Sequence, residues 1–122
     1  DFDFSNVKIE NIEVRNAKND CLDMSFGKYY INNLSLFNCG DKAVSSGEKS
    51  QVIINNGNIN KAYFGIVSKD ESIVDINKVK IENTNYCLAN YRKKQEFDIG
   101  ILKLNDENSV TCYNQNYIWS YE

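Results

Sequence analysis

Two amino acids are missing from this chain of 122 residues: it contains no histidine and no proline. The absence of histidine excludes a Ser-His-Asp or Cys-His catalytic arrangement and any zinc site built on histidine. Catalysis, if there is any, must therefore depend on carboxylates, Lys, Arg, Tyr or Cys. A chain of this length corresponds to one domain, and it is long enough to bury a hydrophobic core.

Basic residues and long apolar runs are also scarce. The chain has 14 Lys and Arg against 17 Asp and Glu, which gives a net charge of −3 and a pI near 5.0. This balance argues against binding to nucleic acid or to an anionic membrane surface, and no apolar run is long enough to span a bilayer. The sequence opens Asp-Phe-Asp-Phe, without a signal peptide or an initiating Met, and we interpret it as a mature or excised piece of a longer protein.

The chain contains an internal repeat of about 22 residues, which appears in two independent columns of apolar residues. The first column has a constant spacing of 22 and consists of Leu22, Val44, Ile66 and Leu88. The second has spacings of 22, 23 and 22 and consists of Ile9, Ile31, Ile54 and Ile76. Two columns that share one period indicate a repeated structural unit.

Apolar and polar residues alternate within each repeat, as in Val7-Lys8-Ile9, which is typical of short β-strands. Asn, Gly, Asp and Ser separate the strands and favour turns. A unit of this size is one coil of a solenoid whose coils stack about 4.8 Å apart. The sequence therefore predicts an all-β parallel β-helix of about five coils over residues 1–109. It also predicts a ladder of side-chain amides, interrupted at Lys78 and formed by Asn11, Asn33 and Asn56.

Residues 110–122 leave the repeat and are rich in aromatic side chains. The end of a solenoid exposes strand edges and an open core, so we predict that this segment caps the last coil. Aromatic residues expected to pack rather than bind are Tyr29, Tyr30, Tyr113, Tyr117, Trp119 and Tyr121.

The coil repeat over about residues 5–104 resembles right-handed parallel β-helix proteins of the carbohydrate-binding and sugar-hydrolase type. Residues 40–50, 65–72 and 91–94 are similar to segments of β-helix modules near the C-terminal end of larger bacterial surface proteins. The resemblance implies a right-handed solenoid and an extracellular or cell-surface location. It implies family membership more than a particular chemistry.

Candidate catalytic residues lie in residues 19–23 (Asn-Asp-Cys-Leu-Asp) and, one coil later, in residues 40–42 (Gly-Asp-Lys). These segments resemble the polygalacturonase patterns Asn-Thr-Asp-Gly-Ile-Asp and Gly-Asp-Asp. The resemblance implies that Asp20, Asp23 and Asp41 are candidates for the acid and base of glycosidic cleavage. Lys42 stands where that family has a second Asp, and residues 63–65 (Tyr-Phe-Gly) replace its Gly-His-Gly. The alternative, which we favour, is a salt bridge between Asp20 and Lys42 on neighbouring coils.

A column of charged residues follows the same register at a turn and consists of Glu48, Asp70 and Arg92. Polysaccharide lyases and epimerases with a β-helix use Lys or Arg as a base and calcium to neutralise a uronate. By that resemblance, an acidic sugar would be bound by Lys69, Arg92, Lys93 and Lys94, and calcium by Glu48 and Asp70. The alternative, which we favour, is that stacked turns place charges of alternating sign above one another and thereby relieve repulsion.

Aromatic residues form a third candidate binding feature. Phe64 and Tyr86 are one coil apart in register, and Tyr63 and Tyr91 lie nearby in the sequence. Exposed tyrosine rings stack on sugars, but a ladder of rings also rigidifies a turn, and we favour the second interpretation.

The four cysteines do not read as a disulfide framework. Cys21 and Cys87 share one column but lie three coils apart, about 14 Å, which exceeds the limit of roughly 7 Å between the Cα atoms of a disulfide. Cys39 and Cys112 have no evident partner, and no CxxC motif indicates zinc. We interpret all four as small buried or half-buried residues, and the sequence leaves open whether any of them is oxidised.

Two classes of function follow from these observations. The first is a non-catalytic β-helix module of a larger bacterial surface or secreted protein, which acts as a scaffold or binds a polysaccharide or a neighbouring domain. The second is a fragment of a β-helical polysaccharide lyase, epimerase or hydrolase. The missing histidine and the interrupted carboxylate pair favour the first, with no cofactor except possible calcium.

Overall fold

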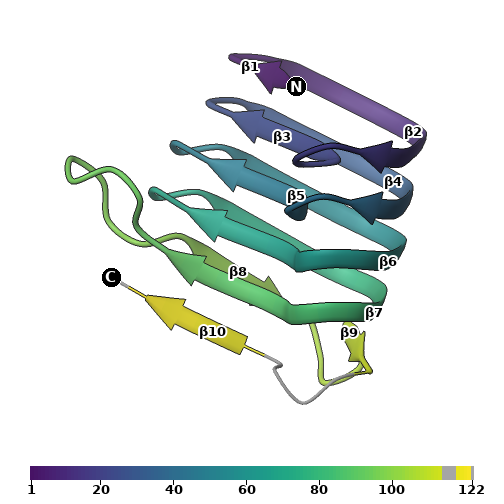
Figure 1. The fold of residues 1–122 in the computed structure, drawn as a ribbon. Helices are drawn as coiled ribbons and strands as arrows, with labels where there is room; N and C mark the ends of the chain where they lie inside the picture. Colours follow the sequence, from purple (N-terminus) through teal and green to yellow (C-terminus); the bar gives the residue numbers. More distant parts are fainter. Residues whose placement is uncertain (114–117, 122) are drawn as a thin grey trace.

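The computed structural model is a parallel β-solenoid without helices in the part of the chain that it describes, which is residues 1–113 and the backbone of 118–121. Each coil runs along one strand, turns a corner and continues along the next, so that equivalent segments lie above one another (Figure 1). The strands in chain order are β1 (Phe2–Asp3), β2 (Asn6–Ala17), β3 (Leu22–Ser25), β4 (Lys28–Cys39), β5 (Lys42–Gly47), β6 (Gln51–Lys69), β7 (Ile73–Tyr91), β8 (Ile101–Leu104), β9 (Val110–Cys112) and β10 (Ile118–Tyr121).

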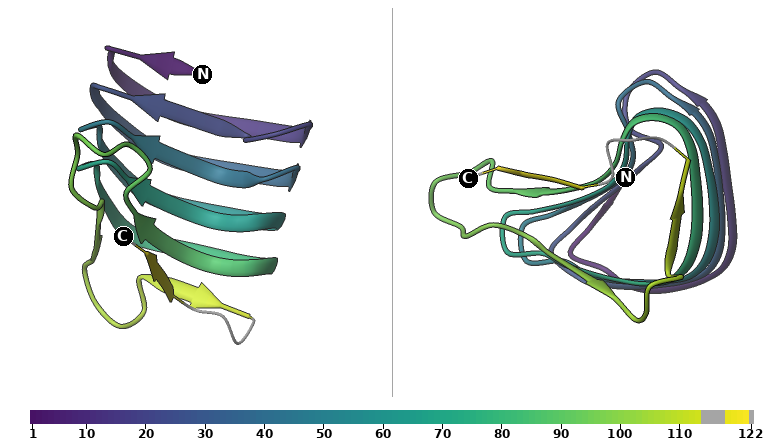
Figure 2. Two further views of the ribbon diagram at one scale, coloured as in Figure 1. Left: turned by 60° about the vertical axis from the view of Figure 1, so that its left-hand side comes forward. Right: turned by 90° about the horizontal axis from the view of Figure 1, so that it is seen from below.

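The predicted 22-residue register is confirmed. β2, β4, β6 and β7 pair in parallel and align the column Ile9, Ile31, Ile54 and Ile76. β3, β5 and the second halves of β6 and β7 align the column Leu22, Val44, Ile66 and Leu88. The stack comprises about four turns rather than the expected five, and Figure 2 shows them from the side and along the axis.

Both apolar columns point into the solenoid and form one continuous core. Ile31, Ile54, Ile66 and Leu88 are fully buried in it. Burying a side chain of this size contributes about 1.5–3 kcal/mol. A slip of one residue would turn each column outward, so the core fixes the register.

Side-chain ladders stabilise the corners of the coils. The predicted amide ladder is present between Asn33 and Asn11, where Nδ2 donates to Oδ1 at 3.1 Å. A longer ladder, which the sequence analysis missed, lies one residue earlier in each coil. In it Asn32 donates to Glu10 at 2.6 Å, Asn55 to Asn32 at 2.7 Å and Asn77 to Asn55 at 2.9 Å.

The interpretation that the cysteines form no disulfide framework is wrong. Disulfides join Cys21 to Cys39, with Cα atoms 5.3 Å apart, and Cys87 to Cys112, with Cα atoms 6.1 Å apart. The sequence separations of 18 and 25 are close to the 22-residue period, so each bridge links one coil to the next. The pairing could not be found within one 22-residue column, because the two cysteines of each bridge lie on adjacent coils but a few residues out of register.

The last coil lies below β7. β8, β9 and β10 each pair in parallel with β7, after the segment 92–100 projects beyond the stacked turns (Figures 1 and 2). The division at residues 109 and 110 and the capping role of 110–122 stay predictions, since the side chains of Tyr117, Trp119 and Tyr121 lie outside the described residues. Tyr29 packs in the core as expected, whereas the prediction for Tyr30 is wrong because its side chain is 38% exposed.

Candidate functional site

A group of charged side chains gathers on the outward face of β3, β5 and the second half of β6. Because Leu22, Val44 and Ile66 point inward, the residues that follow them point outward. These are Asp23, Ser45 and Val67, which share one column. We use the name lysine–aspartate cluster for Asp20, Asp23, Asp41, Lys42 and Lys69.

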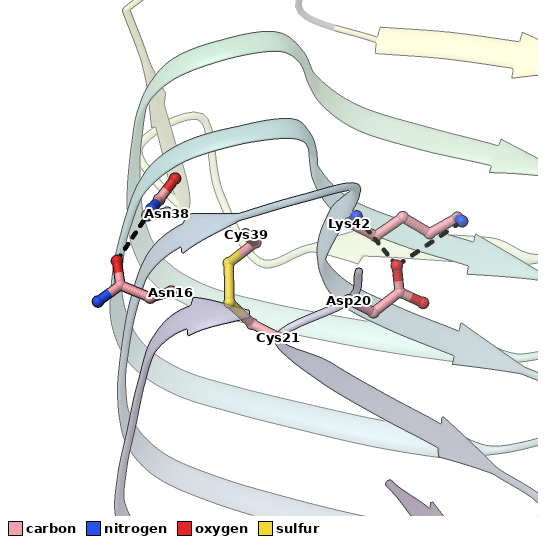
Figure 3. The surroundings of a disulfide bond; sticks show 6 residues. All are labelled: Asn16, Asp20, Cys21, Asn38, Cys39 and Lys42. Carbon is pink, nitrogen blue, oxygen red and sulfur yellow. Dashed lines mark hydrogen bonds and ion pairs between the residues drawn. A yellow bond between two sulfur atoms is a disulfide. The ribbon is translucent and has the colours of Figure 1, made fainter. Parts of the chain in front are cut away.

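Lys42 joins two of the candidate catalytic residues. Its ammonium lies 2.7 Å from Asp41 Oδ2. The same ammonium lies 3.9 Å from Asp20 Oδ1, and the backbone N–H of Lys42 donates to this oxygen at 3.1 Å (Figure 3). The salt bridge expected between Asp20 and Lys42 is therefore present. Burial opposes the charge on Lys42, but the hydrogen bond to Asp41 and the nearby acidic groups outweigh it and raise the pKa of Lys42.

Lys69 belongs to the same cluster but has no such partner. Its side chain is 8% exposed, and in the described part of the chain no hydrogen bond or ion pair engages its ammonium group. Burial, with the charges of Lys42 and Lys93, lowers the pKa of Lys69, and Asp23 and Asp20 only partly offset this effect. The result is a mostly enclosed amine near two carboxylates that do not pair with it.

A glycine gives Lys69 its position. Lys69 follows Gly47 one coil later in the β5–β6 stack, and a Cβ atom on Gly47 would stand 3.2 Å from Cε of Lys69. The side chain of Lys69 therefore lies across the bare backbone of β5. A larger residue at position 47 would displace it.

Ser45 adds a second unpaired donor to this face. It is fully buried, and its hydroxyl has no hydrogen-bond partner in the structure. A buried polar group without a partner costs about 1–3 kcal/mol. Because Ser45 is fully buried, its hydroxyl is not accessible to a polymer in solvent. Ser45 was not predicted from the sequence, although its 22-residue spacing from Asp23 and the run of small residues at 45–47 could have indicated that it belongs to this face.

Tyr91 borders the cluster on β7, where it pairs in register with Lys69. Burial raises the pKa of the Tyr91 hydroxyl, while Lys42 acts in the opposite direction. Of the predicted binding residues, Lys69 and Tyr91 thus lie with the candidate catalytic residues.

The predicted aromatic group continues the column of Lys42. Phe64 follows Lys42 in register and Tyr86 follows Phe64, and the two rings stack with centroids 5.4 Å apart. Tyr63 packs edge-on against Phe64 at 4.9 Å and is 45% exposed. This geometry is the expected ring ladder. The backbone N–H of Tyr63 donates to the carbonyl of Asp41 at 2.9 Å, so Tyr63 is a neighbour of the cluster.

In the predicted charge column, Asp70 and Glu48 contact the projecting segment 92–100. Asp70 is fully buried and its Oδ1 accepts the backbone N–H groups of Lys93 at 2.7 Å and Lys94 at 2.9 Å. Glu48 Oε2 lies 2.9 Å from Lys94 Nζ. These contacts fasten the projecting segment 92–100, in which Arg92 is exposed.

The two candidate calcium ligands, Glu48 and Asp70, each have one carboxylate oxygen engaged by the projecting segment, whereas Oδ2 of Asp70 is buried without a hydrogen-bond partner. Glu48 binds an ammonium group, and one oxygen of Asp70 accepts two amides. Among residues 1–113, no group of three or more acidic or cysteine side chains is placed to hold a metal ion. Within the same residues no helix has the length and apolarity needed to cross a membrane.

Comparisons with protein-family models, with curated proteins and with solved structures gave no match for this chain. The parallel β-helix fold is shown by the structure itself. The chemistry of the chain has to be argued from its own side chains.

Proposed function

We propose that this chain is a non-catalytic module that binds a hydroxyl-rich, neutral polysaccharide across the lysine–aspartate cluster and the ring of Tyr63. The observation that carries the proposal is the ammonium of Lys69, which has no ion-pair or hydrogen-bond partner in the described part of the chain although the charges of Asp23 and Asp20 act on it. Lys69 lies on the outward face of the second half of β6, near the column that carries Asp23.

The chemistry of this face fits sugar hydroxyls. A hydroxyl both donates and accepts hydrogen bonds, and the face offers carboxylate acceptors next to ammonium and hydroxyl donors. The acidic and basic groups nearly balance, with Asp20, Asp23 and Asp41 against Lys42 and Lys69, so a neutral ligand meets no net repulsion. A tyrosine ring at the border gives an apolar surface for one face of a sugar.

Binding is favoured over hydrolysis by the position of Lys42. Glycoside hydrolysis uses two carboxyl groups that flank the scissile bond. Here the ammonium of Lys42 lies within 3.9 Å of both Asp20 and Asp41, and it joins the pair instead of leaving it open to a substrate.

Isothermal titration calorimetry tests the proposal with soluble β-glucan, xylan, mannan and galactan. We expect one of these polymers to bind, and Lys69→Met and Tyr63→Ala each to weaken binding by about tenfold. The matched control is Lys80→Met, because Lys80 is an exposed lysine on β7 away from the cluster. The proposal fails if no neutral polymer binds, or if both cluster variants bind as well as the native chain.

One observation favours a second candidate, a polysaccharide lyase. Lys69 has a lowered pKa and pairs in register with Tyr91, so an amine suited to act as a base lies near a phenol suited to act as an acid. Ultraviolet absorbance of unsaturated uronates, measured after incubation with uronate polymers, tests this candidate. Product that disappears in Lys69→Met would replace the binding function with the lyase.

The two disulfides support the proposal of an extracellular or cell-surface location. Such bonds form and persist in oxidising compartments and are rare in the cytosol. Mass spectrometry of the chain under non-reducing conditions tests this part of the proposal, which requires that the cysteines are bridged in the protein as the cell produces it.

A further inference from the structure

A second groove lies on a different face of the solenoid from the lysine–aspartate cluster. It has a volume of about 910 Å³ and runs along the outward face of the first halves of β2, β4, β6 and β7 and of β8. One register column supplies much of its lining, namely Lys8, Tyr30, Ile53, Asp75 and Lys103. Lys28 lies beside this column in the neighbouring one.

The groove is basic although the chain is acidic. Three lysines, Lys8, Lys28 and Lys103, face one carboxylate, Asp75, in a chain with a net charge of −3. None of the three ammonium groups has a hydrogen bond or an ion pair with any residue that the structure describes. Local positive charge of this kind attracts an anionic ligand.

The middle of the groove is apolar over two neighbouring coils. Tyr30 is 38% exposed and Ile53 is 40% exposed, one coil apart. Coils are spaced by about 4.8 Å, which is close to the length of one pyranose residue in an extended polysaccharide. A sugar chain along the solenoid axis therefore advances by about one ring per coil.

The groove lies on a sheet face and offers side chains rather than free backbone. The backbone groups of β4 and β6 are already paired with neighbouring coils on both sides, so an extended peptide cannot add to the sheet there. Tyrosine, amide and ammonium side chains suit rings that carry hydroxyl and acidic groups.

We propose that this groove binds a linear anionic polysaccharide along the solenoid axis. Lys8, Lys28 and Lys103 contact its carboxylate or sulfate groups, and Tyr30 packs against a sugar ring. This site is separate from the one proposed for neutral polysaccharides, and neither depends on the other.

The test is calorimetric titration of the full chain with a glucuronic acid oligomer, with sulfated dextran and with polyglutamate. We expect at least one anionic sugar polymer to bind, with affinity that falls as salt is added. Lys28→Gln combined with Lys103→Gln, and separately Tyr30→Ala, weaken that binding by about tenfold. The polymer that binds shows whether the recognised group is a carboxylate or a sulfate.

The controls separate this site from the cluster. Lys80→Gln removes an exposed lysine outside the groove and leaves binding unchanged. The proposal is overturned if neither anionic sugar polymer binds, if the groove variants bind like the native chain, or if Lys69→Met abolishes the interaction. Equal binding of polyglutamate also overturns it, because the site would then recognise charge without the sugar.

Discussion

Lys69 shows how a single residue acquires unusual properties from the stacking of coils. Its stem crosses Gly47 and its environment is enclosed, while the nearest carboxylates remain unpaired with it. Burial without a partner disfavours the charged form of an amine. In the folded chain the pKa of Lys69 is therefore lower than the ordinary value of 10.5.

This lowered pKa predicts a pH dependence of stability. At pH values between the folded pKa of Lys69 and 10.5, the unfolded chain binds more protons than the folded chain. The free energy of unfolding therefore rises with pH in this range. Below that window the buried charge destabilises the fold. We expect Lys69→Met to be more stable than the native chain at pH 7.

Urea denaturation at pH 7, 8, 9 and 10 checks this prediction. The advantage of Lys69→Met shrinks as the pH rises through the folded pKa of Lys69 toward 10.5, because the native lysine then loses its proton. The raised pKa values of Lys42 and Tyr91 act only above about pH 10. A difference between the two proteins that stays constant with pH would contradict the account.

Asp70 gives a second prediction at the residue scale. Its Oδ1 accepts two backbone N–H groups of the segment 92–100, and hydrogen bonds to charged groups contribute about 1.5–3 kcal/mol each. We expect Asp70→Ala to lower the free energy of unfolding by about 3 kcal/mol. Asp70→Asn costs less, because an amide oxygen still accepts and Asn tolerates the positive φ of 51° at this position.

Chemical denaturation of the two Asp70 variants, with Asp75→Asn as a control outside this turn, measures these costs. Equal stability of Asp70→Ala and the native chain would show that the segment is held by other contacts.

At the scale of the elements, side-chain ladders tie neighbouring coils together at the corners. Asn55 lies in the middle of the longer ladder, where it donates to Asn32 and accepts from Asn77. Asn33, by contrast, makes one exposed amide bond, to Asn11. The ladders therefore differ in the number of bonds lost when one member is removed.

We predict that Asn55→Ala lowers the free energy of unfolding by about 2 kcal/mol and Asn33→Ala by about 0.5–1 kcal/mol. Thermal and urea unfolding of the two variants provide the comparison. The ladder account is contradicted if the two substitutions have the same cost.

The elements show how far the sequence determines this fold. Apolar columns such as Ile9 to Ile76 were sufficient to predict the strands, the parallel stacking and the register, because burial repeats with each coil. The Asn32–Asn55–Asn77 ladder and the disulfides were not predicted, since they depend on how each corner turns. The corner geometry shifts partners out of the column by a few residues.

The candidate site was predictable only in part, for a related reason. Asp20, Asp23, Asp41, Lys69 and Tyr91 were all identified from patterns, but in separate groups. Whether two of these side chains lie on the same face depends on the direction in which each points once the chain has turned the corner between two strands of a coil. The shared face is visible only when Leu22, Val44 and Ile66 are known to point inward.

For the whole molecule, two disulfides fasten consecutive coils near opposite ends of the solenoid. One joins Cys39, at the end of β4, to Cys21, directly before β3. The other joins Cys87 in β7 to Cys112 in β9. Coils contact only their neighbours, so the terminal coils of a solenoid are the first to open. Bridges at these places prevent such local opening.

We predict that removing either bridge destabilises the fold by about 3 kcal/mol, the value typical for loops of this length. Urea denaturation of Cys21→Ala/Cys39→Ala and Cys87→Ala/Cys112→Ala, each with and without reductant, measures the effect. Reductant lowers the midpoint of the native chain further than that of either variant. An unchanged midpoint in the native chain would contradict the assigned pairing.

The central claim is that the face around Lys69 binds a neutral polysaccharide, and amide chemical-shift mapping by NMR tests it most directly. An isotope-labelled chain is titrated with an oligosaccharide of the neutral polymer that binds in calorimetry. The account predicts shifts concentrated in residues 41–47 and 63–69, which carry the cluster and Tyr63. Shifts confined to other faces, or no shifts at saturating oligosaccharide, would contradict it.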